Sequence, residues 1–312
     1  MSQCFCALIF TLLLVAAASV EAATCPDTDA LALSWLDKMS RNSQQLSYHG
    51  VATLQRGGDL QVLQFSHLES QDDSSESLIK LTGQGAQVER GPHPLDCIHP
   101  GQQLLRFGDA LQASDCDMAR QYRFSVVGDG RVAGRDTVQI EVVPRDMYRF
   151  GYLLYLDKET GLLLKSETIG HGHKVLEKFQ FARLSYSEAV PSVNGVVVTH
   201  QARHPDARNP AISTPVSRDW TVNWLPRGFM PTDISFGTSG RRTYTDGLAV
   251  FSVFLEDLNR EMRPGEGLVR QGGTTSYTRG MLIAEEPVLV TVVGEVPVNT
   301  ARMVADSIAW EH

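Results

Sequence analysis

The sequence predicts an α+β protein in which two series of antiparallel strands follow one another, each accompanied by helix. Two observations carry this prediction. Between the first and last helical segments, apolar residues mostly alternate with polar ones, as in strands with one buried and one solvated face. A stretch rich in proline and small polar residues, 204–217, separates the two series. Short strands joined by hairpin turns form a meander, which either curls into a barrel or buries one face under helices.

Composition places the chain among globular proteins and narrows its partners. Its 312 residues are 42% hydrophobic, which excludes wholesale disorder and allows one large domain or two ordinary ones. With 28 Lys and Arg against 36 Asp and Glu, the net charge is −8. This charge argues against a nucleic-acid binder, because such proteins present a basic face to phosphates. A cationic, neutral or apolar partner fits better.

The first 23 residues have the layout of a cleaved secretory signal peptide. Phe5–Val20 is almost entirely apolar, and small residues at positions 22 and 23 precede polar sequence. The apolar run is shorter than the roughly 20 residues that a membrane span needs. An uncleaved anchor and lipidation at Cys25 are the alternatives. We expect the mature chain, from residue 24 on, to lie in an exported and oxidising compartment.

Two cysteines of the mature chain, Cys97 and Cys116, are 19 positions apart and can form a disulfide in such a compartment. Closing this loop would stabilise the fold by roughly 3 kcal/mol through its effect on the unfolded state. The same cysteines with His93 and His99 can be written as a four-ligand zinc site. However, their spacing matches no familiar zinc motif, and each histidine precedes a proline. We therefore expect the disulfide and no metal.

The mature protein is predicted to begin with a helix. Its apolar residues recur at i, i+3, i+4 and i+7, which gives a single apolar stripe, and Thr28 or Asp29 can cap its first turn. Three alternating strands are predicted further along. The stripe consists of Ala32, Trp35, Leu36 and Met39, and the strands lie at Tyr48–Leu54, Tyr122–Val126 and Val138–Val142.

Segments rich in glycine and aspartate mark the turns between these strands. Gly57–Asp59, Gly128–Gly130 and Asp157–Gly161 contain residues that tolerate positive φ. The last of them separates two apolar runs, Tyr152–Leu156 and Leu162–Ile169, and therefore predicts a hairpin.

Beyond the linker, the pattern predicts a compact α+β domain over residues 218–312. Alternation resumes at Trp220–Trp224. Leu248–Leu255 and Val288–Val293 are nearly continuous apolar runs, which are typical of strands covered on both faces. The chain is predicted to end in a helix that Asn299 caps. The apolar stripe of this helix is formed by Ala301, Val304, Ala305 and Ile308.

The sequence contains no local signature of catalysis. The motif Gly-x-Ser-x-Gly is missing, and Ser235 and Ser239 have no recognisable setting for a nucleophile. His171-Gly172-His173 can offer two imidazoles to a metal, but the segment is typical of a solvated turn between strands. Gly128–Gly130 with Gly134 lies between strands and lacks the helix N-terminus that would hold a phosphate. We expect no enzyme, cofactor or metal, with an exported hydrolase as an alternative.

An aromatic-rich segment is the candidate ligand surface of the first part. Tyr148, Phe150 and Tyr152 lie close to Leu154 in one strand region. A curved sheet with so apolar a face, and only one convincing helix to cover it, leaves a concave surface that can hold an acyl chain. Each buried CH₂ group then contributes about 0.8 kcal/mol. A pure packing role in the core is the alternative, and the residues alone leave the choice open.

Long motifs in both halves of the chain resemble the MucB/RseB family. In the first half the matching segments are Gly130–Arg135 and Val143–Tyr152, the latter running on through Leu156–Ser166. In the second half they are Tyr244–Phe254 and Val293–Pro297, followed by the closing helix. The resemblance covers essentially the whole mature chain in the right order.

This resemblance implies a periplasmic regulator of the envelope-stress sigma factor, and no enzyme. Such a protein binds the periplasmic part of a single-span anti-sigma factor of the RseA or MucA type. It shields this partner from the site-1 protease and is released by lipid signals, lipoprotein or lipopolysaccharide. The implied organisation is a half-barrel similar to the lipoprotein carriers LolA and LolB at 24–203, a linker at 204–217 and an anti-sigma-binding domain at 218–312.

The resemblance and the residue pattern together give candidate binding residues. The lipid and the anti-sigma factor must weaken each other's binding by the same factor if they favour different arrangements of the two domains. A periplasmic carrier of lipoproteins or lipids is the alternative function, and self-association into a homo-oligomer is compatible with either. The candidates are Tyr148, Phe150, Tyr152 and Leu154 for lipid, and Arg241, Arg242, Tyr244 and Phe251 for the protein partner.

Overall fold

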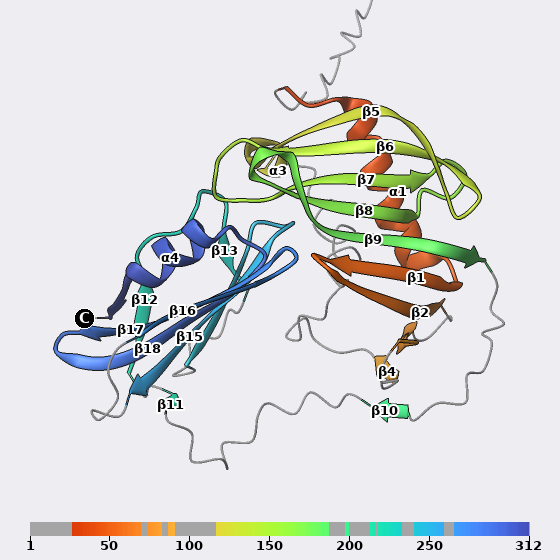
Figure 1. Ribbon diagram of the computed structural model, residues 1–312. Helices are drawn as coiled ribbons and strands as arrows, with labels where there is room; N and C mark the ends of the chain where they lie inside the picture. Colours follow the sequence, from red (N-terminus) through yellow and green to blue (C-terminus); the bar gives the residue numbers. More distant parts are fainter. Residues whose placement is uncertain are drawn as a thin grey trace, which may run out of the picture.

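Figure 1 shows two β-sheets, one from each half of the chain and each accompanied by a helix. The computed structural model describes residues 27–69, 74–82, 87–90, 117–186, 197–199, 213–215, 218–232, 240–258 and 265–311. Strands dominate these residues and helices are few, so the predicted α+β class is confirmed.

Several predicted features lie outside the described residues and stay predictions. They are the signal peptide over residues 1–23, Cys25, the disulfide between Cys97 and Cys116 with its zinc alternative, and the two serines at 235 and 239. Of the linker at 204–217, the short strand β11 (Ser213–Pro215) is described within the second sheet. Within the part of the chain that the structure describes, no helix has the length and apolar character needed to cross a bilayer.

In the described residues, the first sheet has ten strands and is open, because its two end strands are β10 and β5. Its strands are antiparallel neighbours except β10 and β4, which are parallel. Strands β5 to β9 form a meander, and β9 then pairs with β1. In sheet order the strands are β10 (Val197–Thr199), β4 (Gln87–Arg90), β3 (Ser74–Lys80), β2 (Asp59–Glu69), β1 (Tyr48–Arg56), β9 (Lys174–Ser185), β8 (Leu163–Gly170), β7 (Gly151–Asp157), β6 (Arg135–Pro144) and β5 (Tyr122–Val132).

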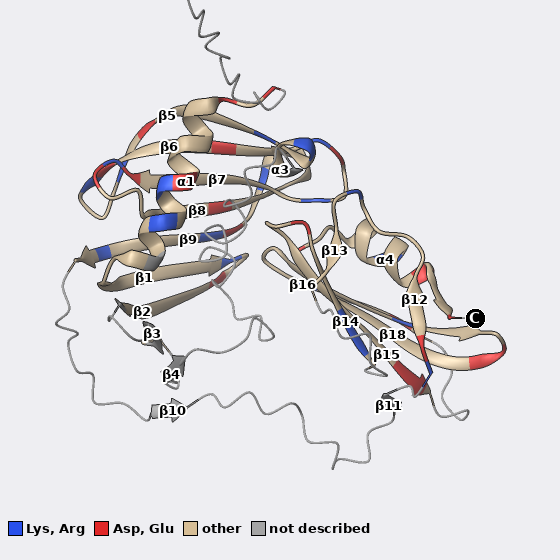
Figure 2. Ribbon diagram, turned by 180° about the vertical axis from the view of Figure 1, so that it is seen from behind, with Lys and Arg blue, Asp and Glu red and all other residues tan. Residues whose placement is uncertain are grey.

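Helix α1 (Ala30–Gln45) lies across one face of this sheet, which we call the inner face (Figure 2). Asp29 caps the helix as predicted, since its Oδ1 accepts a hydrogen bond of 2.8 Å from the backbone N–H of Leu31. Ala32, Leu36 and Met39 are buried against residues of β5 to β8. The single apolar stripe of the sequence is therefore the face that α1 turns toward the sheet.

Polar contacts fix the second half of α1 to the hairpin between β7 and β8. Lys38 Nζ donates to the carbonyls of Lys158 and Glu159, at 3.1 and 2.8 Å. At the end of β7, where the turn begins, Asp157 accepts hydrogen bonds from Arg135 Nε at 2.5 Å and from the Tyr186 hydroxyl at 2.7 Å. The hairpin that the sequence predicted at Asp157–Gly161 is thus present and is held from both sides.

The hairpin between β5 and β6 turns at a different place from the predicted one. Gly128–Gly130 is not a turn but part of β5, where a bulge interrupts the pairing between Val126 and Gly128. The chain reverses at Ala133 and Gly134, whose φ angles are +49° and +79°. Two adjacent residues with positive φ form the tight turn that suits a two-residue hairpin. The glycines upstream therefore accommodate the bulge instead of the reversal.

Two short elements flank the strands of the first sheet. Helix α3 (Asp117–Gln121) leads directly into β5. The 3₁₀ turn η1 (His171–His173) joins β8 to β9, and its residues are exposed. The interpretation of His171-Gly172-His173 as a turn between strands is confirmed.

The second sheet has seven strands in the part of the chain that the structure describes, and it packs on helix α4 (Val298–Asp306) and on a small two-stranded sheet. Its core is formed by alternate residues of the central strands together with Ala301, Val304 and Ala305 of α4. In sheet order the strands are β13 (Met230–Pro231), β14 (Arg241–Thr245), β15 (Val250–Leu258), β18 (Glu286–Gly294), β17 (Thr274–Ile283) and β16 (Glu266–Gln271), with β11 pairing β15. The small sheet joins β12 (Trp220–Val222) to β19 (Ile308–Trp310).

The end of the chain differs from its prediction in two details. Pro297 is the N-cap of α4, and Asn299 lies inside the first turn of the helix, so the predicted cap is wrong. Ile308 belongs to β19 and not to the helix, because the chain leaves the helix at Ser307. Strand β15 is covered on both faces near its start, as predicted, whereas β18 alternates between buried and half-buried residues.

Candidate functional site

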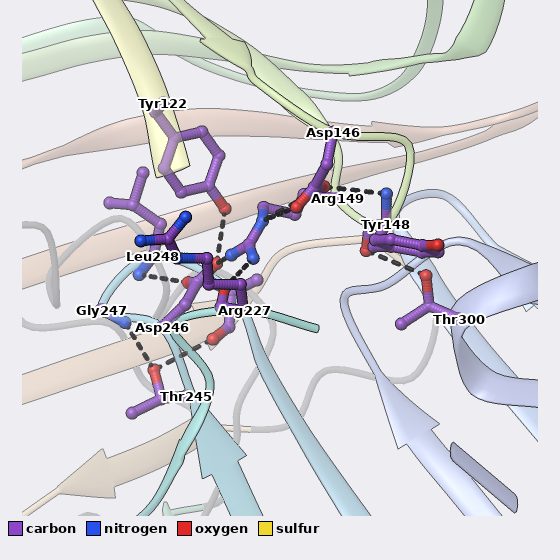
Figure 3. Close-up of polar contacts among 11 residues, drawn as sticks. Tyr122, Asp146, Tyr148, Arg149, Arg227, Thr245, Asp246, Gly247, Leu248 and Thr300 are labelled. Carbon is purple, nitrogen blue, oxygen red and sulfur yellow. Dashed lines mark hydrogen bonds and ion pairs between the residues drawn. The ribbon is translucent and has the colours of Figure 1, made fainter. Parts of the chain in front are cut away.

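The two sheets meet at a cluster of polar contacts between two connecting segments (Figure 3). One segment is the loop 145–150 between β6 and β7 of the first sheet, and the other is the turn 246–249 between β14 and β15 of the second. We call this cluster the joint. Its central residues are Arg149, which comes from the loop, and Asp246, which comes from the turn.

Local structure aims Arg149 at the second sheet. The Asp146 carboxylate accepts a hydrogen bond of 2.9 Å from the N–H of Tyr148, which tightens the loop. The same carboxylate lies 3.1 Å from Arg149 Nε. The remaining donors of the guanidinium bind Asp246 and the carbonyl of Arg227. The Arg149 side chain is completely buried, and its guanidinium is 5.0 Å from the centre of the Phe229 ring.

Both oxygens of Asp246 are fully used. Oδ1 accepts hydrogen bonds from the N–H groups of Leu248 and Ala249, at 3.0 and 2.8 Å, which fixes the turn into β15. Oδ2 accepts from Arg149 and from the Tyr122 hydroxyl, the latter at 2.9 Å. A buried carboxylate with this many partners is compensated in charge and in hydrogen bonding. The joint is therefore a structural contact that is complete in itself.

Protonation in the joint is set by burial and by the ion pair. Burial raises the pKa of the Tyr122 phenol well above its ordinary value of 10.0, and the neighbouring Asp246 carboxylate raises it further. Burial alone would lower the pKa of Arg149, but Asp246, Tyr122 and Asp146 together outweigh burial, and the pKa of Arg149 is raised. Tyr122 therefore stays a hydrogen-bond donor and Arg149 stays charged near neutral pH.

Apolar contacts surround the polar ones. Leu248, from the second half of the chain, is buried in the core cluster of the first sheet under α1. The rings of Tyr148 and Trp224 meet edge to face with centroids 5.2 Å apart. Thr300 Oγ1 of α4 donates to the Tyr148 carbonyl at 2.9 Å. The joint thus binds the first sheet to the turn, to the segment after β12 and to the closing helix of the second part.

The four residues expected to bind lipid occupy different positions. Tyr152 and Leu154 are buried on the inner face within the cluster that α1 covers. Phe150 is buried just before β7, and Tyr148 lies half-buried in the joint and not in a strand. The sequence left open whether these residues line a concave surface for lipid or pack in the core. In the structure, Phe150, Tyr152 and Leu154 occupy core positions.

The residues expected to bind the protein partner are also divided. Phe251 is fully buried and Tyr244 stacks on it at 5.4 Å, both in the core of the second sheet. Arg241 and Arg242 are half-buried on β14. The guanidinium of Arg242 lies 4.8 Å from the centre of the Trp220 ring. The aromatic pair therefore supports the sheet from within, and the arginines are the members of this set that reach its surface.

The joint was not found from the sequence. Arg149 is a charged residue between aromatic neighbours, Tyr148 and Phe150, and a charge inside an apolar run signals a buried partner. Asp246 stands before Gly247 in a segment typical of a turn, where an aspartate is usually local. Pairing the two requires knowledge of which loops meet. Among the described residues, no group of three or more His, Cys, Asp or Glu side chains is arranged to hold a metal.

Fold and joint together define a two-domain α+β protein in which an open antiparallel sheet is bound to a second sheet through a buried ion pair. The chain belongs to the MucB/RseB family. The model of the MucB/RseB N-terminal domain matches residues 31–201, and that of the C-terminal domain matches residues 214–309. The suspected family is therefore confirmed over both halves of the chain.

Relatives and solved structures of this family resemble the whole chain. It is 32% identical to the sigma factor AlgU regulatory protein MucB of Pseudomonas aeruginosa, over 92% of this chain and 93% of that protein. It is 27% identical to the sigma-E factor regulatory protein RseB of Escherichia coli K12, over 94% and 93%. The solved structure of MucB in complex with MucA(peri) covers 90% of this chain and 99% of its own, with 33% identity and a TM-score of 0.69. A second MucA/MucB complex, from Pseudomonas aeruginosa, covers 91% and 100%, with 29% identity and a TM-score of 0.70.

Proposed function

We propose that the chain is a periplasmic regulator of a sigma factor, and that it acts by binding the periplasmic part of a single-span anti-sigma factor. The observation that carries the proposal is the likeness to MucB solved together with MucA(peri), because it extends over both sheets. The predicted signal peptide supports the periplasmic location. The polar groups of the joint are all engaged with one another, as in a structural contact, and this agrees with a binding role for the protein.

The proposed binding protects the anti-sigma segment from cleavage and is reversible. Bound to the anti-sigma segment, the regulator covers the cleavage site of the site-1 protease. Lipid signals, lipoprotein or lipopolysaccharide, release it. Release by a second ligand requires that lipid and segment favour different states of the protein, and each then weakens the other's binding by the same factor.

We assign the binding surface for the segment to β16, an edge strand of the second sheet. All six residues of β16 are exposed, and two of them are apolar, Leu268 at 50% and Val269 at 67% exposure. In the described part of the chain, β16 pairs with β17 on one side and with no strand on the other. Such an edge presents backbone N–H and C=O groups that an extended segment can pair with. The competing surface is the pair Arg241 and Arg242 on β14.

Calorimetric titration of the mature chain with the periplasmic segment of its cognate anti-sigma factor tests the function. We expect a dissociation constant in the micromolar range or tighter, and no binding at about 10 µM protein would overturn the proposal. Incubation of the same segment with the site-1 protease, in the presence and absence of the chain, tests the protective role. Cleavage should slow in proportion to the fraction of segment bound, and unchanged cleavage of a saturated segment would remove the protective role.

Surface variants test the assignment to β16. Replacing Leu268 and Val269 by lysine should weaken binding at least about tenfold, because it removes the apolar contacts of the edge. Leu282→Lys on β17 is the matched control, since Leu282 is 64% exposed and lies outside β16. A loss of affinity in Arg241→Glu/Arg242→Glu, with the β16 variant unaffected, would assign the segment to β14.

A further inference from the structure

The two sheets touch a second time beside the joint. Thr168 of β8 pairs with Tyr152, three positions after Arg149, and the β16–β17 turn lies at the same end of the second sheet as the turn 246–249. Thr168 of β8 pairs with Glu177 of β9, and Glu177 pairs with Arg56 of β1. The three side chains therefore lie side by side on one face. Ser166 lies two residues before Thr168 on β8, and therefore on the same face, and it pairs with Leu154. Because Leu154 packs under α1, this face is the inner face of the first sheet.

The turn between β16 and β17 rests on these three residues. A β-carbon added to Gly272 would lie 2.6 Å from Glu177 Oε2 and 2.9 Å from Arg56 Cγ. One added to Gly273 would lie 3.2 Å from Thr168 Cγ2. Both views of the molecule show the tip of this hairpin beside the end of β1 (Figures 1 and 2). Only a side-chain-free turn fits this closely against the pair of Arg56 and Glu177, which are 2.7 Å apart.

The two contacts between the sheets differ in strength. The joint combines a buried ion pair, several hydrogen bonds and the buried Leu248. The turn offers two glycines, which bring no side chain to the contact, and the Arg56–Glu177 pair that it touches belongs entirely to the first sheet. The turn is therefore the weaker of the two contacts, and we expect it to separate before the joint does.

We propose that the β16–β17 turn is a releasable latch through which occupancy of the inner face controls β16. Phe179, which is half-buried, lies two residues from Glu177 on the same strand and therefore on the same face. An acyl chain that enters beside Phe179 competes with Gly272 and Gly273 for this part of the face. The inference rests on the proposed function, since β16 is the strand assigned to the anti-sigma segment.

A designed disulfide tests the latch. A β-carbon on Gly273 would lie 3.7 Å from Thr168 Cβ, within the range that disulfides need. In Thr168→Cys/Gly273→Cys, the two thiols are oxidised by glutathione disulfide, which takes up their two electrons and two protons and leaves as two glutathione molecules. Peptide mapping identifies the bond, and each single variant is a control. The probe is a synthetic lipopeptide carrying two palmitoyl chains.

The rate of disulfide closure reports on the latch without any protein partner. We expect the saturating lipopeptide to slow closure at least about tenfold, because it holds the turn away from Thr168. In the closed form, the affinity for the anti-sigma segment should equal that of the reduced form. The lipopeptide should release the segment from the reduced form alone. Closure that is unaffected by the probe, or equal release from both forms, would overturn the latch while leaving the proposed function in place.

A backbone variant gives an independent test. Gly272 has φ +61°, so Gly272→Ala meets both backbone strain and the clash with Glu177 and Arg56. Gly57 has the same φ with nothing within 4 Å, so Gly57→Ala reproduces the strain without the clash. We expect Gly272→Ala to lower the lipopeptide concentration needed for half-release at least about threefold relative to Gly57→Ala. Equal values for the two variants would contradict a latch at this turn. Failure of the anti-sigma segment to bind the wild-type chain would instead refute the proposed function.

Discussion

Arg149 and Asp246 are 97 positions apart in the chain, and both side chains of their ion pair are completely removed from solvent. The pair joins a loop of the first sheet to the turn that enters the central strand of the second. The pair therefore contributes to fixing the position of one sheet relative to the other.

Removing one partner of the pair should destabilise the protein strongly. Arg149→Met leaves Asp246 buried without its charge partner, and we expect the free energy of unfolding to fall by about 3–5 kcal/mol. Urea denaturation followed by tryptophan fluorescence measures this. Arg218→Met is the matched control, because Arg218 and Glu286 form an exposed pair that contributes about 0–1 kcal/mol. Equal effects of the two substitutions would mean that the joint carries no special stability.

Local sequence pattern predicted the elements of the fold well where one physical cause acts alone. The apolar stripe and the Asp29 cap gave α1, and the segment Asp157–Gly161 gave its hairpin. The turn at Ala133 and Gly134 was missed, because glycines at 128 and 130 carry the same signal and only the pairing register shows which pair reverses the chain. Asn299 was misjudged as a cap, because α4 begins directly after Pro297 without any side-chain capping hydrogen bond.

The contacts between the sheets could not be derived from the sequence. A charged residue among aromatic neighbours, such as Arg149, indicates a buried partner but does not identify it, and Asp246 gives only the signal of a local turn. Tyr152 and Leu154 were recognised as apolar face, but whether such a face is open or covered depends on how α1 and Leu248 pack on it. The local period of apolar residues shows which face of a helix or strand is buried, but not which other element packs against that face.

Leu248 should contribute to stability through the core of the other domain. Leu248→Ala removes buried methyl groups from the cluster under α1, and we expect a loss of about 2–5 kcal/mol in the free energy of unfolding. Thermal unfolding of the variant, beside the exposed control Leu282→Ala, measures the difference. A Leu248→Ala protein as stable as its control would show that the turn does not pack into the first sheet in solution.

Substitutions at Tyr152 distinguish a core residue from a ligand-binding one. The ring is 4% exposed under α1, and burial raises the pKa of its phenol well above the ordinary value. Tyr152→Asp places a carboxylate in that site, so we expect the protein to unfold or to lose at least about 3 kcal/mol of stability. Tyr152→Phe keeps the ring and should stay folded. Circular dichroism of both variants shows whether each is folded. A stable Tyr152→Asp protein with weakened lipopeptide binding would restore the interpretation of Tyr152 as part of an open ligand-binding surface.

The stability of the first sheet should depend on pH through Asp157. Burial alone would raise the pKa of this carboxyl group, but the hydrogen bonds from Arg135, Tyr186 and other donors outweigh it, and the pKa lies below its ordinary value of 3.8. A lowered pKa in the folded state means that the stabilisation is complete above the ordinary pKa and is lost as the pH falls through the folded one. At neutral pH, Asp157→Asn should therefore unfold at lower urea concentration than the wild type.

This difference should shrink as the pH is lowered from about 5 to 2, because the wild-type carboxylate then becomes protonated and loses the same interaction. Urea midpoints measured across that range for both proteins test the prediction. Asp129→Asn is the control, since the side chain of Asp129 is 71% exposed and pairs with the exposed Lys158. A gap between wild type and Asp157→Asn that stays constant down to the lowest pH would show that the ionised form of Asp157 is not what Arg135 and Tyr186 stabilise.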